Sequence, residues 1–160
     1  TSRTSPEEFS LTSLINDSFG DLAQLSQRPV ELDLQDVSMT GTEGGWAQLL
    51  ANLAQNVSRY TPTDAPVAVR LKHTDKGGES WFTLTVDDGG PGIPIHNREM
   101  IFDRFTRLDQ ARDSSTGGFG LGMSIIKSVV VAHQGELALD DSPLGGLRVE
   151  ISAPTRPRQP

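Results

Sequence analysis

Two pairs of segments with alternating apolar and polar residues constrain the fold of this chain more than any other feature. VAVRLKHT (67–74) and SWFTLTVD (80–87) alternate as β-strands do, and the turn sequence DKGG (75–78) lies between them. ELALD (136–140) and GLRVEIS (146–152) repeat this arrangement. The sequence therefore predicts two β-hairpins, and the apolar face of their sheet needs a cover from elsewhere in the chain.

Predicted helices can provide that cover. Apolar residues recur at helical spacing from Leu11 to Leu25, where Ser10 or Thr12 can cap the start. A second amphipathic helix is predicted for 46–60 and a third from about 121 to 132. With VELDL (30–34) as a further strand, we expect an α+β sandwich: a mixed sheet of about five strands, covered on one face by about three helices.

Composition excludes several classes of protein. The 160 residues fit one domain, and the absence of cysteine excludes disulfides and thiolate chemistry. A formal net charge of −7 argues against broad electrostatic binding to nucleic acid or to an anionic membrane. We therefore expect no nucleic-acid partner. No apolar run reaches membrane-spanning length either, so we expect no direct membrane contact in this fragment.

TGGFGLGMSIIK (116–127) places glycines directly before an apolar helix. It is no dinucleotide fingerprint, because the third glycine of that pattern would fall at Met123, and it lacks the Gly-Lys-Ser/Thr of a P-loop. Glycines before a helix let backbone amides approach an anion. The alternative is a plain flexible loop, and 106–119 is predicted to be mobile.

Asp88 ends a predicted strand and is followed by Gly90 and Gly92. A carboxylate presented in this way can accept a hydrogen bond from an exocyclic amine such as adenine N6, and Ile93 can contact a flat base. A simple Asp-Gly turn is the alternative.

Three amide side chains share one face of the second helix, because Gln48, Asn52 and Asn56 are spaced four residues apart. Amide oxygens suit Mg²⁺ that bridges phosphates. Arg59 can meet phosphate oxygens and Tyr60 can flank a base. A solvated polar face is the alternative interpretation.

Taken together and in order, these segments resemble the catalytic domain of two-component sensor histidine kinases, in the GHKL (Bergerat-fold) ATPase superfamily. NLAQNVSRYTP resembles the N box, DGGPGI the G1 box, IFDRFTRLD (101–109) the F box and GFGLGMSIIK the G2 box. The resemblance covers roughly 10–152, which leaves 1–9 and 153–160 as tails. It implies a Bergerat-fold two-layer sandwich with a mobile ATP lid.

The resemblance also implies roles for single residues. Asn56 is the principal Mg²⁺ ligand, and Asn52 supports either the Mg²⁺ or the phosphates. Arg59 contacts phosphate, and Tyr60 lies on the adenine or ribose side. Gln48 lies near the γ-phosphate, where a catalytic role is a hypothesis.

The resemblance implies further roles in the base pocket, in the lid and in a domain contact. Asp88 holds adenine N6, directly and through water. The pocket is shaped by Gly90, Gly92 and Ile93. The lid is hinged by Gly118, Gly120, Leu121 and Gly122. The F-box aromatics Phe102 and Phe105 contact the lid and the helical dimerisation domain.

By this resemblance, the full-length protein binds ATP and Mg²⁺ and transfers the γ-phosphate to a histidine on its dimerisation domain. A response-regulator aspartate then receives it. His73, His96 and His133 lack the sequence context of that acceptor, so we expect a cytoplasmic fragment of a bacterial membrane receptor that does not phosphorylate itself alone.

Three alternatives stay open at this stage. One is an ATPase of gyrase, heat-shock chaperone or mismatch-repair type, against which the F box and short lid argue. The second is a stand-alone serine kinase of the anti-sigma type. The third is a non-catalytic module that signals through contacts.

Overall fold

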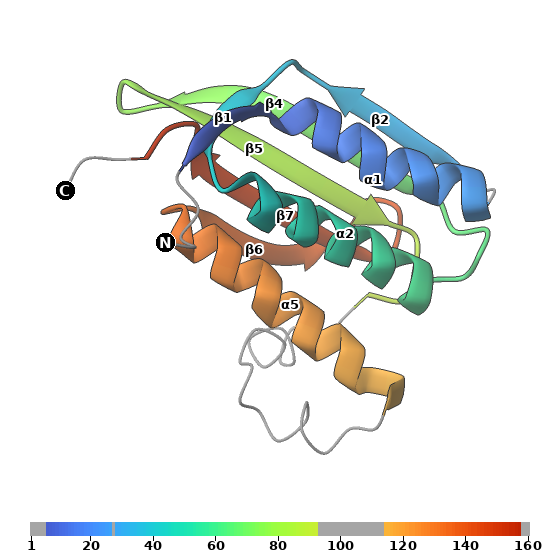
Figure 1. Ribbon diagram of the computed structural model, residues 1–160. Helices are drawn as coiled ribbons and strands as arrows, with labels where there is room; N and C mark the ends of the chain where they lie inside the picture. Colours follow the sequence, from blue (N-terminus) through green and yellow to red (C-terminus); the bar gives the residue numbers. More distant parts are fainter. Residues whose placement is uncertain (1–5, 27, 93–113, 158–160) are drawn as a thin grey trace.

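The computed structural model describes residues 6–26, 28–92 and 114–157, which form two layers (Figure 1). One layer is a mixed five-stranded sheet of order β2-β4-β5-β7-β6, and the helices cover one of its faces. The predicted α+β sandwich is therefore confirmed. Its strands are β1 (Glu7–Ser10), β2 (Val30–Leu34), β3 (Ser38–Gly41), β4 (Val67–Lys76), β5 (Glu79–Asp88), β6 (Glu136–Asp141) and β7 (Leu147–Pro154), and its helices are α1 (Leu11–Ser26), α2 (Glu43–Tyr60) and α5 (Ser114–Ala132).

Both predicted hairpins are present, and they lie side by side because β5 pairs antiparallel with β7. Gly77 and Gly78 turn the first hairpin with positive φ angles of 60° and 86°, as a two-residue turn of type I′ requires of both central residues. β2 adds to β4 in parallel. Parallel neighbours need a long connection, and α2 lies within that connection. The topology thus fixes α2 over the sheet.

The core lies between the helices and the covered face of the sheet. Trp46 of α2 packs edge-on against Phe82 of β5, with ring centroids 5.5 Å apart. Alternate residues of the central strands are buried, as the alternation in the sequence predicts. The buried helix residues that meet them include Leu11, Ile15, Phe19, Leu49, Leu50, Leu53, Met123, Ile126 and Val130.

Ser10 caps α1, since its Oγ accepts the Ser13 N–H at 3.1 Å. Of the two predicted caps, Ser10 is therefore the one observed. Thr12 ties the helix to the loop after β2 instead. Its Oγ1 donates to the Gln35 carbonyl at 2.8 Å and accepts the Val37 N–H at 2.9 Å.

Two short strands were not predicted. The segments 7–10 and 38–41, where the sequence indicated no strand, pair antiparallel as β1 and β3. Phe9 and Met39 are paired in this ladder, and both are buried in the core. Four residues are too few for alternation to stand out in the sequence, so the pairing depends on these tertiary contacts.

The start of α2 is supported by His133, the residue that follows α5. Thr42, the N-cap residue, makes no side-chain cap, but its N–H donates to His133 Nε2 at 3.1 Å. His133 Nδ1 lies 2.8 Å from the Val129 carbonyl, so Nδ1 carries the proton and Nε2 is the acceptor. A side chain at position 41 would meet the His133 ring at 2.7 Å, which explains Gly41. This support lets α2 begin at Glu43, before the predicted start at Trp46.

His133→Ala is expected to lower the free energy of unfolding by roughly 1–2 kcal/mol, because it removes the cap and the edge contact with Trp46 at 5.2 Å. For a chain of this length the melting temperature should fall by about 3–6 °C. Thermal unfolding followed by circular dichroism measures this. The control is His73→Ala at an exposed site on β4, and equal melting temperatures for the two variants would contradict the prediction.

α5 begins at Ser114, whereas the sequence predicted a loop through 106–119 and a helix from about Leu121. The prediction was wrong for 114–119. The four glycines of 117–122 are helical although each costs about 1 kcal/mol relative to alanine inside a helix.

Candidate functional site

A cavity of about 210 Å³ lies between α2, α5 and the adjoining ends of β5 and β7. Most of its lining is apolar and a few polar groups converge on it, which is typical of a site for a small organic ligand. The apolar lining consists of Leu53, Val57, Val86, Pro91, Met123, Leu147 and Val149, and the rest of Asn56, Thr61, Asp88 and Gly92.

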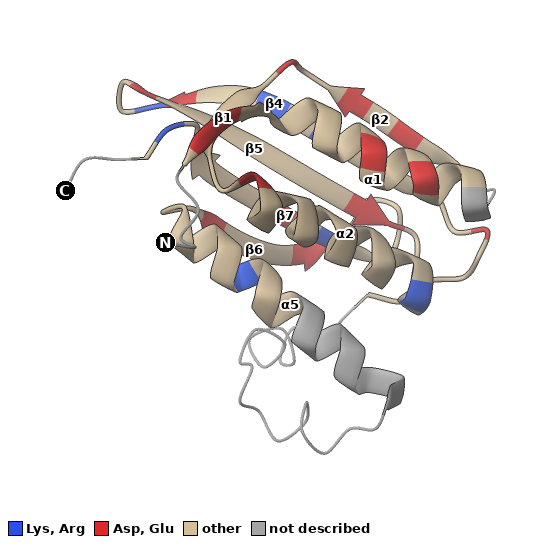
Figure 2. Cartoon of the chain, viewed as in Figure 1, with Lys and Arg blue, Asp and Glu red and all other residues tan. Residues whose placement is uncertain are grey.

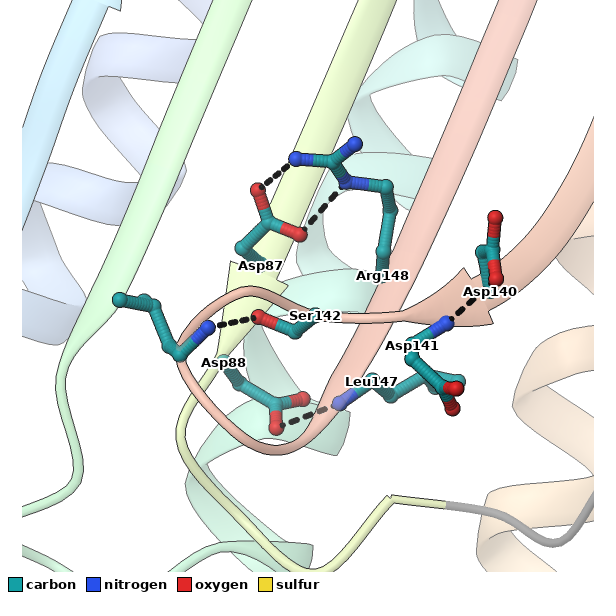
Figure 3. A network of polar contacts seen from close by, with 8 residues as sticks. Asp87, Asp88, Asp140, Asp141, Ser142, Leu147 and Arg148 are labelled. Atoms are coloured by element: carbon teal, nitrogen blue, oxygen red, sulfur yellow. Dashed lines mark hydrogen bonds and ion pairs between the residues drawn. The ribbon is translucent and has the colours of Figure 1, made fainter.

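Asp88 is the acidic residue of the described cavity lining, and it is 9% exposed. Its Oδ1 accepts the Gly90 N–H at 2.9 Å. The same oxygen accepts the Leu147 N–H at 3.1 Å (Figure 3). These two bonds fix the carboxylate. Within the described part of the chain no donor contacts Oδ2, so this oxygen is available to a ligand.

The turn between β6 and β7 also supports Asp88. The sequence predicted this hairpin but not the contact of its turn with Asp88. Gly146 donates its N–H to the Asp88 carbonyl at 3.1 Å, and a Cβ at this position would lie 2.1 Å from Asp88 Oδ1. Ser142 orders the turn, since its Oγ accepts the Leu144 N–H at 3.0 Å and its own N–H donates to the Gly146 carbonyl at 2.8 Å. The signal in the sequence was the pair Gly145 and Gly146, where the predicted strand 146–152 begins.

Asp87 and Arg148 clamp the two strands beside this support. The guanidinium donates from Nε at 2.8 Å and from Nη2 at 3.0 Å, a bidentate pair (Figure 3). Hydrogen bonding to Asp87 raises the pKa of Arg148 above its ordinary value, so the cation persists throughout the physiological range. The pair lies one position along the ladder from Asp88 and Leu147.

The three amides of α2 do not enter the cavity equally. Asn56 lines it and donates from Nδ2 to Met123 Sδ at 3.5 Å. Asn52 is half-buried, and its Nδ2 is a buried donor with no hydrogen-bond partner in the described structure. Gln48 and Arg59 are exposed. An orphaned amide beside Asn56 fits a polar ligand group at this face of α2.

The glycine residues of the G1 segment adopt conformations that explain their identity. Gly92 lines the cavity with φ 77°, a left-handed conformation that favours glycine. Gly90 faces Thr61, whose Cγ2 would lie 2.6 Å from an added Cβ. The structure therefore brings Asp88, Gly92 and Asn56 to one cavity.

Other predicted site residues are less well defined by the structure. Gly118, Gly120, Leu121 and Gly122 belong to the helical backbone of α5, where amides beyond the first turn are bonded within the helix. Tyr60 is the last residue of α2. Ile93, Phe102 and Phe105 lie outside the described residues.

Acidic residues gather away from this cavity. Asp17 and Asp21 are exposed on α1, and Glu31 and Asp33 are exposed on β2, at one edge of the sheet (Figure 2). None of these four carboxylates belongs to the described lining of the cavity.

Comparison with known protein families shows to which family this chain belongs. The family described as "Histidine kinase-, DNA gyrase B-, and HSP90-like ATPase" matches residues 41–157. The chain belongs to this ATPase family. The match includes α2, α5 and the strands that line the cavity, whereas α1 lies before it.

Several curated relatives of this ATPase domain are sensor kinases. The chain is 41% identical to the sensor histidine kinase CpxA of Escherichia coli K12 over 114 residues, 71% of this chain and 24% of CpxA. It is 43% identical to the sensor protein RstB of the same strain over 107 residues, 67% of this chain and 23% of RstB. The chain thus spans about a quarter of the length of these relatives.

Solved structures of such domains share the fold. The mycobacterial sensor histidine kinase MprB superposes with a TM-score of 0.78 at 29% identity, covering 96% of this chain and 99% of that one. The catalytic domain of the histidine kinase ThkA gives a TM-score of 0.75 at 20% identity, with 97% and 100% covered.

Proposed function

We propose that this chain is the ATP-binding catalytic domain of a sensor histidine kinase. The observation that carries the proposal is Asp88: a carboxylate with one oxygen fixed by two backbone amides and the other available at an apolar cavity. Such an oxygen accepts a hydrogen bond from adenine N6, while the apolar lining contacts the ring. Gly90, Gly92 and Ile93 complete this base site in the proposal.

The phosphates would then lie along α2 towards the start of α5. We assign Asn56 as the principal Mg²⁺ ligand and Asn52 as a support of the Mg²⁺ or of the phosphates. The unpartnered Nδ2 donor of Asn52 suits a phosphate oxygen. Bound Mg²⁺ would neutralise phosphate charge. The other proposed ATP contacts are Gln48 near the γ-phosphate, Arg59 at a phosphate, Tyr60 beside the adenine or ribose, and the lid positions Gly118, Gly120, Leu121 and Gly122.

Helical α5 puts a condition on the lid assignment. Amides within a helix are already bonded, so those of Gly118 and Gly120 reach a phosphate only if this part of α5 unwinds. Glycines at these positions lower the cost of leaving the helix. We propose that the start of α5 changes conformation when ATP binds.

In the full-length protein, we propose that the γ-phosphoryl group passes to a histidine of the dimerisation domain and then to an aspartate of a cognate response regulator. The sensor kinases among the relatives support this assignment. Phe102 and Phe105 would contact the dimerisation domain. We propose that the domain lies on the cytoplasmic side of a bacterial membrane receptor. Separately, none of the helices in the described residues combines the length and the apolar character of a membrane span.

Calorimetric titration with a non-hydrolysable ATP analogue, with and without Mg²⁺, tests the proposal. The wild type should bind, and Mg²⁺ should increase the affinity. Asn56→Ala should lose that increase, whereas Gln55→Ala, at an exposed neighbouring position, should retain it. Absence of binding by the wild type would refute the function, and stable phosphohistidine on the isolated chain would refute its dependence on a separate domain.

A further inference from the structure

Arg28 is a buried cation directly behind the cavity wall, in the connection between α1 and β2. It is 4% exposed, and burying a guanidinium is unfavourable unless its donors are satisfied. Its Nη1 donates to Thr61 Oγ1 at 2.6 Å. The acceptor is thus a residue that lines the cavity.

Thr61 is the C-cap residue of α2, and its hydroxyl is held from two sides. Oγ1 donates its proton to the Val57 carbonyl, one turn back in α2, and accepts from Arg28. The cation also lies at the end of a helix where carbonyl groups are unpaired, which favours positive charge. With both bonds made, the side chain is confined to one rotamer.

That rotamer places the Thr61 methyl group against the backbone that supports Asp88. A Cβ on Gly90 would lie 2.6 Å from Thr61 Cγ2, so the two residues are in close contact. Gly90 in turn donates its N–H to Asp88 Oδ1. Contacts therefore run without a break from Arg28 through Thr61 and Gly90 to the carboxylate.

We propose that Arg28 is a positioning residue for base recognition: it locks Thr61, which holds Gly90 and orients the Asp88 carboxylate towards the exocyclic amine of adenine. This inference rests on the proposed function. It adds a residue from outside the nucleotide-binding motifs and from outside the family match at 41–157. Arg28 acts through Thr61 and has no contact of its own with the nucleotide.

The test compares the affinities of ADP and inosine diphosphate, which has an oxygen in place of the N6 amine. Arg28→Met should weaken ADP binding about tenfold. It should also reduce the preference for ADP over inosine diphosphate by about threefold or more, because an unfixed Asp88 discriminates poorly. A residue that only stabilises the fold would leave that preference unchanged once the folded protein is titrated.

Thr61→Val removes the hydroxyl and nearly conserves the volume, so it should reproduce the Arg28→Met effect. The double variant should bind ADP no more weakly than either single variant, because both changes break the same bond. Arg70→Met is the matched control, since Arg70 is an exposed arginine on β4, and it should bind as the wild type does. If Arg28→Met does not fold, the same titrations of Arg28→Lys and Thr61→Val test the inference in its place.

Wild-type affinity and wild-type preference in a folded Arg28 variant and in Thr61→Val would overturn the inference, as would additive losses in the double variant. These outcomes leave the proposed function standing if the wild type binds ADP and Asp88→Asn does not. Failure of the wild type to bind ADP would remove the proposed function and this inference with it.

Discussion

Asp88→Asn is expected to weaken ADP binding by about 100-fold or more while the domain stays folded. The amide oxygen of asparagine can still accept the Gly90 and Leu147 N–H bonds, so the support of this side chain is retained. The second carboxylate oxygen, however, becomes an NH₂ donor that faces the N6 amine of adenine. Loss of a hydrogen bond to a charged group, with donor now against donor, is worth about 3 kcal/mol, which corresponds to this change in affinity.

Calorimetric titration of the variant with ADP and with inosine diphosphate measures the effect. Inosine presents an acceptor where adenine presents a donor, so the variant should prefer inosine diphosphate. Asp88→Ala is the companion variant, and it should also melt at a lower temperature because two backbone N–H groups lose their acceptor. Unchanged ADP binding in either variant would disprove the base-site assignment.

The elements that the sequence predicted correctly are those whose signal is local. β4, β5 and β2 alternate along their own length, and α2 carries a complete apolar face, so each could be recognised without knowledge of its neighbours. The parallel pairing of β2 with β4 could not be derived in this way. It depends on where α2 returns the chain.

The elements that escaped prediction depend on distant partners. β1 and β3 are four residues each, and their pairing is stabilised by the buried side chains of Phe9 and Met39. The early start of α2 depends on His133, 91 residues further along the chain. Local propensity also failed at the start of α5, where glycines occupy helical positions against their intrinsic preference.

The residues of the candidate site also differ in how far the sequence predicts them. Asp88 and Asn56 stand in short motifs, and the structure brings both to one cavity. Part of the support of Asp88 comes from outside these motifs: Leu147 reaches Asp88 across 59 positions, and Arg28 reaches Thr61 across 33. Residues that bind a ligand can be inferred from a motif, whereas residues that position them emerge from the packing.

Gly146→Ala is expected to have the second large effect, on both stability and binding. A methyl group at this position would lie 2.1 Å from Asp88 Oδ1, 2.6 Å from the Gly90 nitrogen and 2.7 Å from the Asp88 carbonyl oxygen. Two of these three contacts are backbone atoms, so the β6–β7 turn must move away from β5. The bonds from Gly146 and Leu147 to Asp88 then break. We expect a loss of roughly 2–4 kcal/mol in the free energy of unfolding.

For a chain of this size that loss lowers the melting temperature by about 5–15 °C, which circular dichroism measures directly. ADP affinity should fall even at temperatures where the variant is folded, because Asp88 loses its Leu147 partner. Gly20→Ala is the matched control: an added Cβ meets nothing within 4 Å in the middle of α1, so this variant should be as stable as the wild type or up to about 1 kcal/mol more stable, with unchanged binding. If Gly146→Ala melted and bound ADP as Gly20→Ala does, the turn would not support Asp88, and the availability of its second oxygen would need another explanation.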